Sequence, residues 1–144
     1  IANRTPGRAE SVAKKIRVLG TNAQTIELAH PGSSDADSFR EQLNTSEIVV
    51  NTTSVGLYPP DQSLLTGFQD LLHPDQLVAD IIYYPQETLL LKQAKEQGCR
   101  TLSGAGMLVY QGAQAFRLWT GIDAPVKIMR EVLEEQLKIL DKNR

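Results

Sequence analysis

Short apolar runs that fit strands alternate with amphipathic segments along almost all of the 144 residues. This alternation constrains the fold most, because it is typical of parallel strands joined by crossover helices. Strands are expected at residues 1–2, 23–28, 47–50, 76–82 and 99–102. Helices are expected at residues 5–19, 35–43, 86–97, 104–119 and 125–141. The sequence therefore predicts an α/β fold with an open parallel sheet and flanking helices.

Composition excludes several classes of function. The net charge is −2 and no basic stripe with interleaved aromatic residues is present, so a nucleic-acid partner is not expected. No apolar stretch reaches the roughly 18 residues of a membrane span. The single cysteine, Cys99, permits no internal disulfide, and His30 and His73 lie far apart, so no metal site is predicted. We expect a globular, cytoplasmic protein without a membrane partner.

Polar residues follow three of the expected strands, at residues 3–5, 51–56 and 83–85. In open α/β sheets, ligands bind beyond the carboxyl ends of the strands. The strand that precedes the second group contains Ile48, Val49 and Val50, which predicts burial on both faces. We therefore expect a small-molecule site at this edge of the sheet.

The first polar group has the composition of a phosphate site. Arg4 and Arg8 flank the start of a helix, and Thr5 is expected to cap that helix and to offer its hydroxyl. In a dinucleotide-binding fold, the second strand ends beside the adenosine ribose. An acidic residue there selects NAD, whereas a neutral residue followed by Arg accepts the 2′-phosphate of NADP. The local pattern leaves a second interpretation open, namely a capped helix with two solvated arginines.

Five stretches together resemble the shikimate dehydrogenase family, in that family's order and spacing. They lie at residues 3–9, 51–57, 80–88, 104–111 and 115–121. The first is similar to an Asn-Arg-Thr-x-x-Arg motif, and the third to an Asp-x-x-Tyr-x-Pro-x-x-Thr segment. The second departs from the family pattern, because Thr52 replaces Ala and Leu57 replaces Met. The resemblance implies a Rossmann-like fold.

The resemblance also implies how the chain is divided. Residues 1–121 would form an NADP-binding domain that lacks its first strand and its glycine-rich turn at the N-terminus. Residues 122–144 would form an appended C-terminal helix that packs on an absent substrate-binding domain. The absent first strand would lie between the strand that ends at Ala2 and the strand that ends at Val50.

The resemblance implies individual roles for eight residues. The adenosine 2′-phosphate and ribose of NADP would be held by Asn3, Arg4, Thr5 and Arg8. The backbone of Ile81 and Gly104 would line the nicotinamide end of the cofactor. The substrate, shikimate or 3-dehydroshikimate, would contact Tyr83 and Gln111. Residues near the cofactor would further include Thr53, Ser54 and Met107.

Two of these side chains also have ordinary structural interpretations. Tyr83 fits a half-buried tyrosine at the end of a strand. Gln111 lies on an apolar helical face and needs a hydrogen-bond partner, which backbone or water supplies as readily as a ligand. Asp80 is expected to have a structural role, as a cap for the turn after its strand.

The implied reaction is the NADPH-dependent, reversible reduction of 3-dehydroshikimate to shikimate, a step of the shikimate pathway for aromatic amino-acid biosynthesis. The family's catalytic Lys and Asp lie in its N-terminal domain, so no catalytic residue is assigned here. We expect the isolated chain to be inactive and to bind NADP weakly at best. A quinate/shikimate dehydrogenase paralogue and a non-catalytic Rossmann-like interaction domain are the alternatives, and a homodimer is left open.

Overall fold

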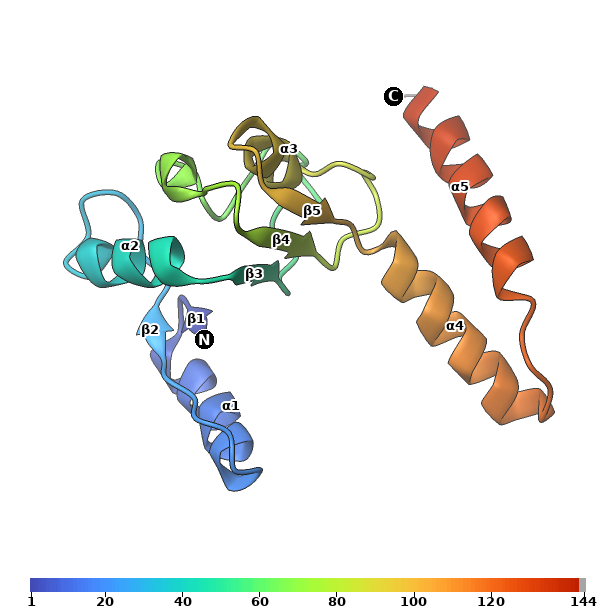
Figure 1. Ribbon diagram of the computed structural model, residues 1–144, viewed down its shortest axis with the longest axis horizontal. Coiled ribbons are helices and arrows are strands. Elements are labelled where there is room, and N and C mark those ends of the chain that lie inside the picture. The colour runs from blue at the N-terminus through green and yellow to red at the C-terminus, as the bar shows by residue number, and fades with distance from the viewer. Residues whose placement is uncertain (143–144) are drawn as a thin grey trace.

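The computed structural model describes residues 1–142 and contains five strands, five α-helices and one 3₁₀ helix (Figure 1). In chain order these are β1 (Ala2–Asn3), α1 (Pro6–Val18), β2 (Ile26–Glu27), α2 (Ala36–Thr45), β3 (Ile48–Asn51), η1 (Gln69–Leu71), β4 (Leu77–Asp80), α3 (Leu89–Glu96), β5 (Arg100–Leu102), α4 (Ala105–Thr120) and α5 (Val126–Lys142). The α/β class, the parallel strands and the flanking helices predicted from the sequence are confirmed.

The strands form two separate parallel sheets rather than one. In the first sheet β1 pairs with β2, placing Ala2 beside Ile26. The second sheet has the order β3-β4-β5, and its register aligns Val49 with Val78 and Val78 with Thr101. Within residues 1–142, no strand pairs with both β1 and β3. This matches the expectation that the strands ending near Ala2 and Val50 lack a shared neighbour.

The hydrophobic core lies on one face of the β3-β4-β5 sheet, between that sheet, α2, η1 and α3. Its buried members are Ala29, Ala36, Phe39, Leu43, Leu65, Phe68, Leu72, Val78, Leu90, Leu91, Ala94 and Cys99. The rings of Phe39 and Phe68 lie 5.0 Å apart in a tilted arrangement. Burial of one Leu or Phe side chain stabilises a fold by roughly 1.5–3 kcal/mol, so this cluster holds the short strands together.

The opposite face of the same sheet is open, and the prediction that residues 47–50 are buried on both faces is wrong. Ile48 is 58% exposed, Val50 is 52% exposed and Leu102, on the same face, is 57% exposed. Side chains alternate between the two faces of a strand. Only Val49 turns toward the core, because the described helices cover only that face.

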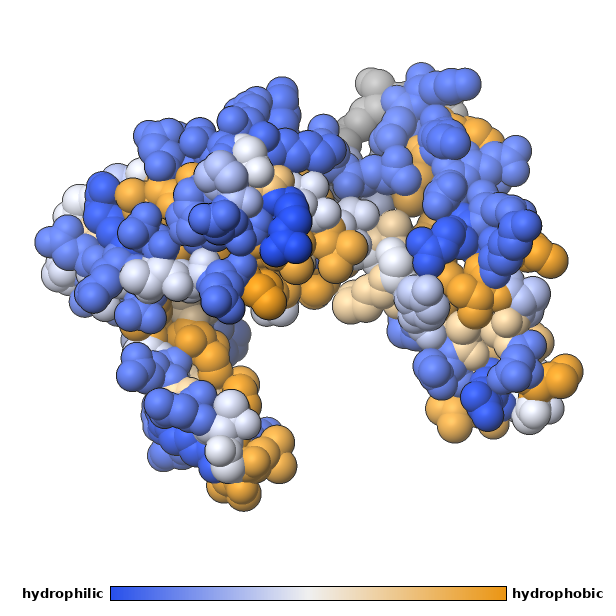
Figure 2. All heavy atoms as spheres, in the orientation of Figure 1, coloured by the Kyte–Doolittle hydropathy of each residue, from blue (hydrophilic) through white to orange (hydrophobic). Residues whose placement is uncertain are grey.

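Two helical units project from the sheets (Figure 1). Helix α1 rests on β1 and β2 through its buried Ala9 and Ala13. Helices α4 and α5 form an antiparallel hairpin, and α4 ends at Gly121, whose φ of 75° is left-handed. Apolar side chains gather at the free ends of both units (Figure 2). The exposed apolar residues of the hairpin include Leu118, Trp119, Ile122, Ile128, Val132, Ile139 and Leu140.

Within residues 1–142, helix α5 packs mainly against α4. Its apolar stripe is partly exposed, as Val132 at 52% shows. The packing of residues 122–144 on a further domain stays a prediction, as does a domain boundary at residue 121. Residues 143–144 of that expected unit lie outside the described residues.

Candidate functional site

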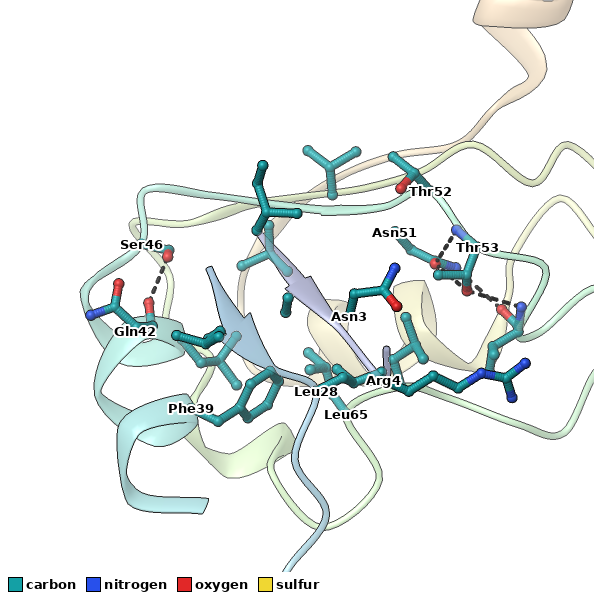
Figure 3. Close-up of a pocket in the computed structure, with 18 of the residues that line it drawn as sticks. Asn3, Arg4, Leu28, Phe39, Gln42, Ser46, Asn51, Thr52, Thr53 and Leu65 are labelled. Carbon is teal, nitrogen blue, oxygen red and sulfur yellow. Dashed lines mark hydrogen bonds between the residues drawn. The ribbon is translucent and has the colours of Figure 1, made fainter. Parts of the chain in front are cut away.

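A cavity of about 600 Å³ separates the two sheets (Figure 3). Strand β1 forms one wall and strand β3 the other, and the apolar side chains of Leu28, Phe39 and Leu65 also line the cavity. Asn3 and Arg4 lie toward the end of the cavity where Asn51, Thr52 and Thr53 follow β3, whereas Gln42 and Ser46 lie at the other end (Figure 3). The carboxyl ends of β1 and β3 therefore meet at one polar edge.

The residues predicted to hold a 2′-phosphate gather at this edge. Asn3, Arg4 and Arg8 all line the cavity. Both arginines are exposed, and within residues 1–142 neither guanidinium has an ion pair or a hydrogen bond. The first turn of α1 contains no acidic residue. The positive end of the helix and two free guanidinium groups make this edge suitable for an anion.

Thr5 departs from its expected role. It occupies the N-cap position of α1, but its side chain forms no capping hydrogen bond. The Asn3 side chain instead accepts a hydrogen bond from the Thr5 backbone N–H through Oδ1, at 2.8 Å. Asn3 thus closes the turn into α1, and its amide Nδ2 together with the exposed Thr5 hydroxyl stays available for a ligand.

The turn after β3 is built around the buried side chain of Asn51, which is 3% exposed. Its Oδ1 accepts hydrogen bonds from the backbone N–H and the hydroxyl of Thr53, at 2.9 and 2.8 Å. Its Nδ2 donates to the carbonyl of Val55 at 3.2 Å. This network turns Thr53 and Ser54 toward the cavity, as two of its lining residues. Sequence reasoning named these two but missed the organising role of Asn51.

Ile81 and Gly104 lie side by side, as expected of residues that line one part of a site. The Gly104 N–H donates to the carbonyl of Ile82 at 3.0 Å, and a Cβ atom on Gly104 would overlap the carbonyl of Ile81. The Ile81 N–H in turn donates to the carbonyl of Asn51 at 3.1 Å. Neither Ile81 nor Gly104 lines the cavity that contains Arg4.

Tyr83 lies two residues after Ile81, and Gln111 lies on α4, seven residues after Gly104. Tyr83 is 44% exposed. Gln111 is exposed, and its Nε2 donates to the carbonyl of Leu108 in its own helix at 3.1 Å. The backbone partner considered for Gln111 is therefore present. Among the described residues, no hydrogen bond joins Tyr83 to Gln111, and neither side chain lines the cavity.

Residues 1–142 contain neither a metal-binding cluster nor a membrane-spanning helix. No group of three or more His, Cys, Asp or Glu side chains is arranged to hold a metal ion in that part of the chain. No helix in the same range has the length and apolar character that a membrane span requires.

Known proteins are similar to this chain in sequence and in fold. Residues 104–134 match the family model described as the shikimate 5′-dehydrogenase C-terminal domain. The NADP(+) shikimate dehydrogenase of Methanopyrus kandleri is 42% identical over 139 residues, which are 96% of this chain and 46% of that protein. The chain thus spans about half the length of the curated relatives that it matches.

Solved structures agree with the sequence match. Shikimate 5-dehydrogenase from Listeria monocytogenes, solved with shikimate and NAD, gives a TM-score of 0.82 at 37% identity, covering 92% of this chain and 46% of that one. Quinate dehydrogenase from Corynebacterium glutamicum, solved with NAD, gives 0.79 at 30% identity, covering 93% and 45%. The resemblance seen in five sequence stretches is confirmed: the chain is related, over almost its whole length, to the C-terminal part of the shikimate dehydrogenases.

Proposed function

We propose that this chain forms the NADP-binding part of a shikimate dehydrogenase, an oxidoreductase that reversibly reduces 3-dehydroshikimate to shikimate. The observation that carries the cofactor assignment is the pair of free guanidinium groups, Arg4 and Arg8, at the carboxyl end of β1. The solved relatives include complexes with NAD and complexes with NADP, so the choice of NADP is argued from these residues of the chain itself.

The adenosine end of the cofactor suits the polar edge beside β1. Arginine offers a planar fork of donors that fits phosphate, and two such groups stabilise the doubly charged 2′-phosphate. The Asn3 Nδ2 and the Thr5 hydroxyl are free to reach the ribose, because Asn3 uses only Oδ1 for the turn. The rest of the adenosine group would lie beyond the carboxyl ends of β1 and β3, where open parallel sheets bind their ligands.

The nicotinamide end of the cofactor is assigned to the β3-β4-β5 sheet. Bound NADPH supplies the hydride, and this chain supplies binding and orientation. The backbone of Ile81 and Gly104 forms a surface without side chains for the nicotinamide, and Tyr83 and Gln111 offer a hydroxyl and an amide to the substrate. We assign no catalytic acid or base to this chain, and the proton comes from residues outside it.

The substrate, the compartment and the oligomeric state belong to the same proposal. Shikimate is chosen over quinate because two curated relatives, each matched over 139 residues, are named shikimate dehydrogenases. The cytoplasm fits the free, buried Cys99, since secreted domains favour disulfides. The exposed apolar residues of the α4–α5 hairpin offer a surface for a homodimer, which sedimentation of the protein tests.

The cofactor assignment is tested by nucleotide binding to residues 1–144. Titration of the ¹⁵N-labelled chain with adenosine 2′-monophosphate should shift the backbone signals of Arg4, Thr5 and Arg8. We expect adenosine 5′-monophosphate to bind about tenfold more weakly, a difference of about 1.4 kcal/mol. The double variant R4A/R8A should abolish this preference. The matched control, K14A/K15A, removes the same charge from exposed positions of the same helix and should retain it.

The reaction is tested in a chimera that joins the unmatched part of the Methanopyrus kandleri relative to the N-terminus of this chain. We expect reduction of 3-dehydroshikimate with NADPH, slower reduction with NADH, and little reduction of 3-dehydroquinate. Equal rates for the two substrates would favour the quinate/shikimate alternative. Equal rates for the two cofactors would contradict the role given to Arg4 and Arg8.

A further inference from the structure

Asp80 is a buried carboxylate at the carboxyl end of β4, and it receives three hydrogen bonds. It is 2% exposed. Its Oδ1 accepts from the Asn51 Nδ2 and from the Ile82 backbone N–H, both at 3.1 Å. Its Oδ2 accepts from the Thr88 hydroxyl at 2.8 Å. A buried carboxylate is costly unless it is satisfied in this way, and the number of donors exceeds what the cap of a single turn requires.

The three donors belong to three different segments of the site. Asn51 ends β3 and holds the Thr53–Val55 turn. Thr88 is the N-cap of α3, where its hydroxyl also accepts from the Leu91 N–H at 3.4 Å. Ile82 lies between the other two in sequence, two residues after the end of β4. One carboxylate therefore joins the turn after β3, the segment after β4 and the start of α3.

A fourth segment is joined through Ile82. The carbonyl of Ile82 accepts the Gly104 N–H at 3.0 Å, and Gly104 precedes the first residue of α4. The Asp80 carboxylate thus binds the backbone N–H of Ile82, and the residue before α4, Gly104, binds the backbone carbonyl of the same Ile82. The placement of Ile81, Tyr83 and Gly104 relative to one another thus depends on Asp80.

We infer that Asp80 is a positioning residue for the nicotinamide end of the site, through its hydrogen bonds to Asn51, Ile82 and Thr88. This inference rests on the proposed function, which places the nicotinamide against Ile81 and Gly104 and the substrate against Tyr83. The residues proposed to bind the 2′-phosphate belong to β1 and α1, and β1 and β2 share no backbone hydrogen bond with β3, β4 or β5 in residues 1–142.

An amide cannot replace the carboxylate in this position. A carboxylate only accepts hydrogen bonds, whereas an asparagine side chain has one acceptor oxygen and one donor group. In the D80N variant, the new NH₂ group faces either the Thr88 hydroxyl or the donors at Asn51 and Ile82. The variant keeps the size of the side chain and removes the charge that strengthens all three bonds.

The test measures amide hydrogen exchange in the complete 144-residue chain, with D75N as the control, since Asp75 is exposed and precedes the same strand. In D80N, exchange at the Ile82 N–H should accelerate about tenfold, because this group loses its bond to a charged acceptor. Exchange at the Thr53 and Gly104 N–H groups should accelerate too, because their acceptors, Asn51 and Ile82, are held by Asp80. The amides of Ile26 and Leu28, which pair with β1, should change less than about twofold, as should the affinity for adenosine 2′-monophosphate.

Thr88 provides a second, conservative test. T88V removes the hydroxyl that donates to Asp80 and should accelerate exchange at Ile82 and Gly104, whereas T88S keeps the hydroxyl and should restore protection. In the chimera, D80N should raise the KM for 3-dehydroshikimate several-fold and leave the KM for NADPH within about twofold. A smaller fraction of folded protein lowers the rate but changes neither KM. A rise in only the KM for 3-dehydroshikimate therefore separates positioning from simple destabilisation.

Each result decides one question. Equal acceleration of exchange in both sheets, or no acceleration at Ile82 and Gly104, would show that Asp80 does not position this edge. An unchanged KM for 3-dehydroshikimate in D80N would show the same. Failure of the wild-type chain to prefer adenosine 2′-monophosphate would instead overturn the proposed function. The exchange pattern around Asp80 is measured without any nucleotide, so the two failures are distinguishable.

Discussion

The carbonyl group of Ile81 lies against the α-carbon of Gly104, so closely that any side chain at position 104 would overlap it. The φ of Gly104 is −69°, a value that every residue adopts. The contact, rather than the backbone conformation, therefore demands glycine here. This contact brings the end of β4 close to the start of α4, although Asp80 and Gly104 are 24 residues apart in the sequence.

Replacement of Gly104 by alanine should lower the free energy of unfolding by about 1–3 kcal/mol or more, since the overlapping atoms are backbone and cannot move aside easily. Gly106, two residues further on, has open space around its α-carbon. G106A should therefore raise stability by about 0.5–1 kcal/mol, because alanine favours a helix. Urea denaturation of the two variants measures the difference, and equal midpoints would contradict the contact.

Gln76 should be the polar side chain whose loss destabilises the fold most. It is fully buried, and its Nε2 donates to the carbonyls of Leu43 and Ser46, each at 2.8 Å. Q76M keeps the volume and leaves these carbonyls and the His73 N–H without their partner, at a cost of about 2–4 kcal/mol. The exposed Q114M should change stability by less than about 0.5 kcal/mol in the same denaturation experiment.

Burial raises the pKa of the Cys99 thiol above its ordinary value. The native thiol should therefore react with a disulfide reagent at pH 8 much more slowly than the same thiol in urea. Burial of the protonated thiol contributes fully to stability at pH values below the ordinary thiol pKa. This contribution is lost as the pH rises through the raised pKa of the folded state. A C99A variant should not show that decline, and equal reaction rates in buffer and urea would contradict the burial.

Tyr83 should matter for substrate and not for stability. Its side chain is 44% exposed, so Y83F should leave urea denaturation unchanged within about 0.5 kcal/mol. In the chimera, loss of the hydroxyl should lower kcat/KM for 3-dehydroshikimate by up to about tenfold, the value of one neutral hydrogen bond. Y58F is the control, because Tyr58 is 89% exposed and lies outside the cavity lining. A similar loss in both variants would refute the role of Tyr83.

The order and type of the elements could be predicted from the sequence, because apolar periodicity and glycine stops are local signals. Element ends could not. The strand expected at residues 23–28 shortens to Ile26–Glu27, since its one partner in the described structure, β1, offers only two residues. The helix expected from Gln86 begins at Leu89, because the Thr88 hydroxyl caps it and bonds to Asp80. Both limits depend on distant partners.

The residues of the candidate site also differ in whether they could be predicted from the sequence. Arg4 and Arg8 could be found from a helix start without acids, which is a pattern within a few residues. The bond between Asn51 and Asp80 spans 29 positions, so the sequence shows two polar strand ends but not their pairing. Asp80 alone is indistinguishable from an ordinary turn cap, and only the packing of β3 beside β4 reveals its three partners.

The distance in sequence between the arginines near β1 and the residues that follow β4 has a consequence for how such a protein changes over generations. On the proposed assignment, the residues that choose between NADP and NAD lie at positions 3–8, on the sheet of β1 and β2. The residues that face the substrate lie on the other sheet and on α4. A lineage can therefore exchange one cofactor for the other by a few substitutions after β1, while the strand ends that recognise its substrate are inherited unchanged.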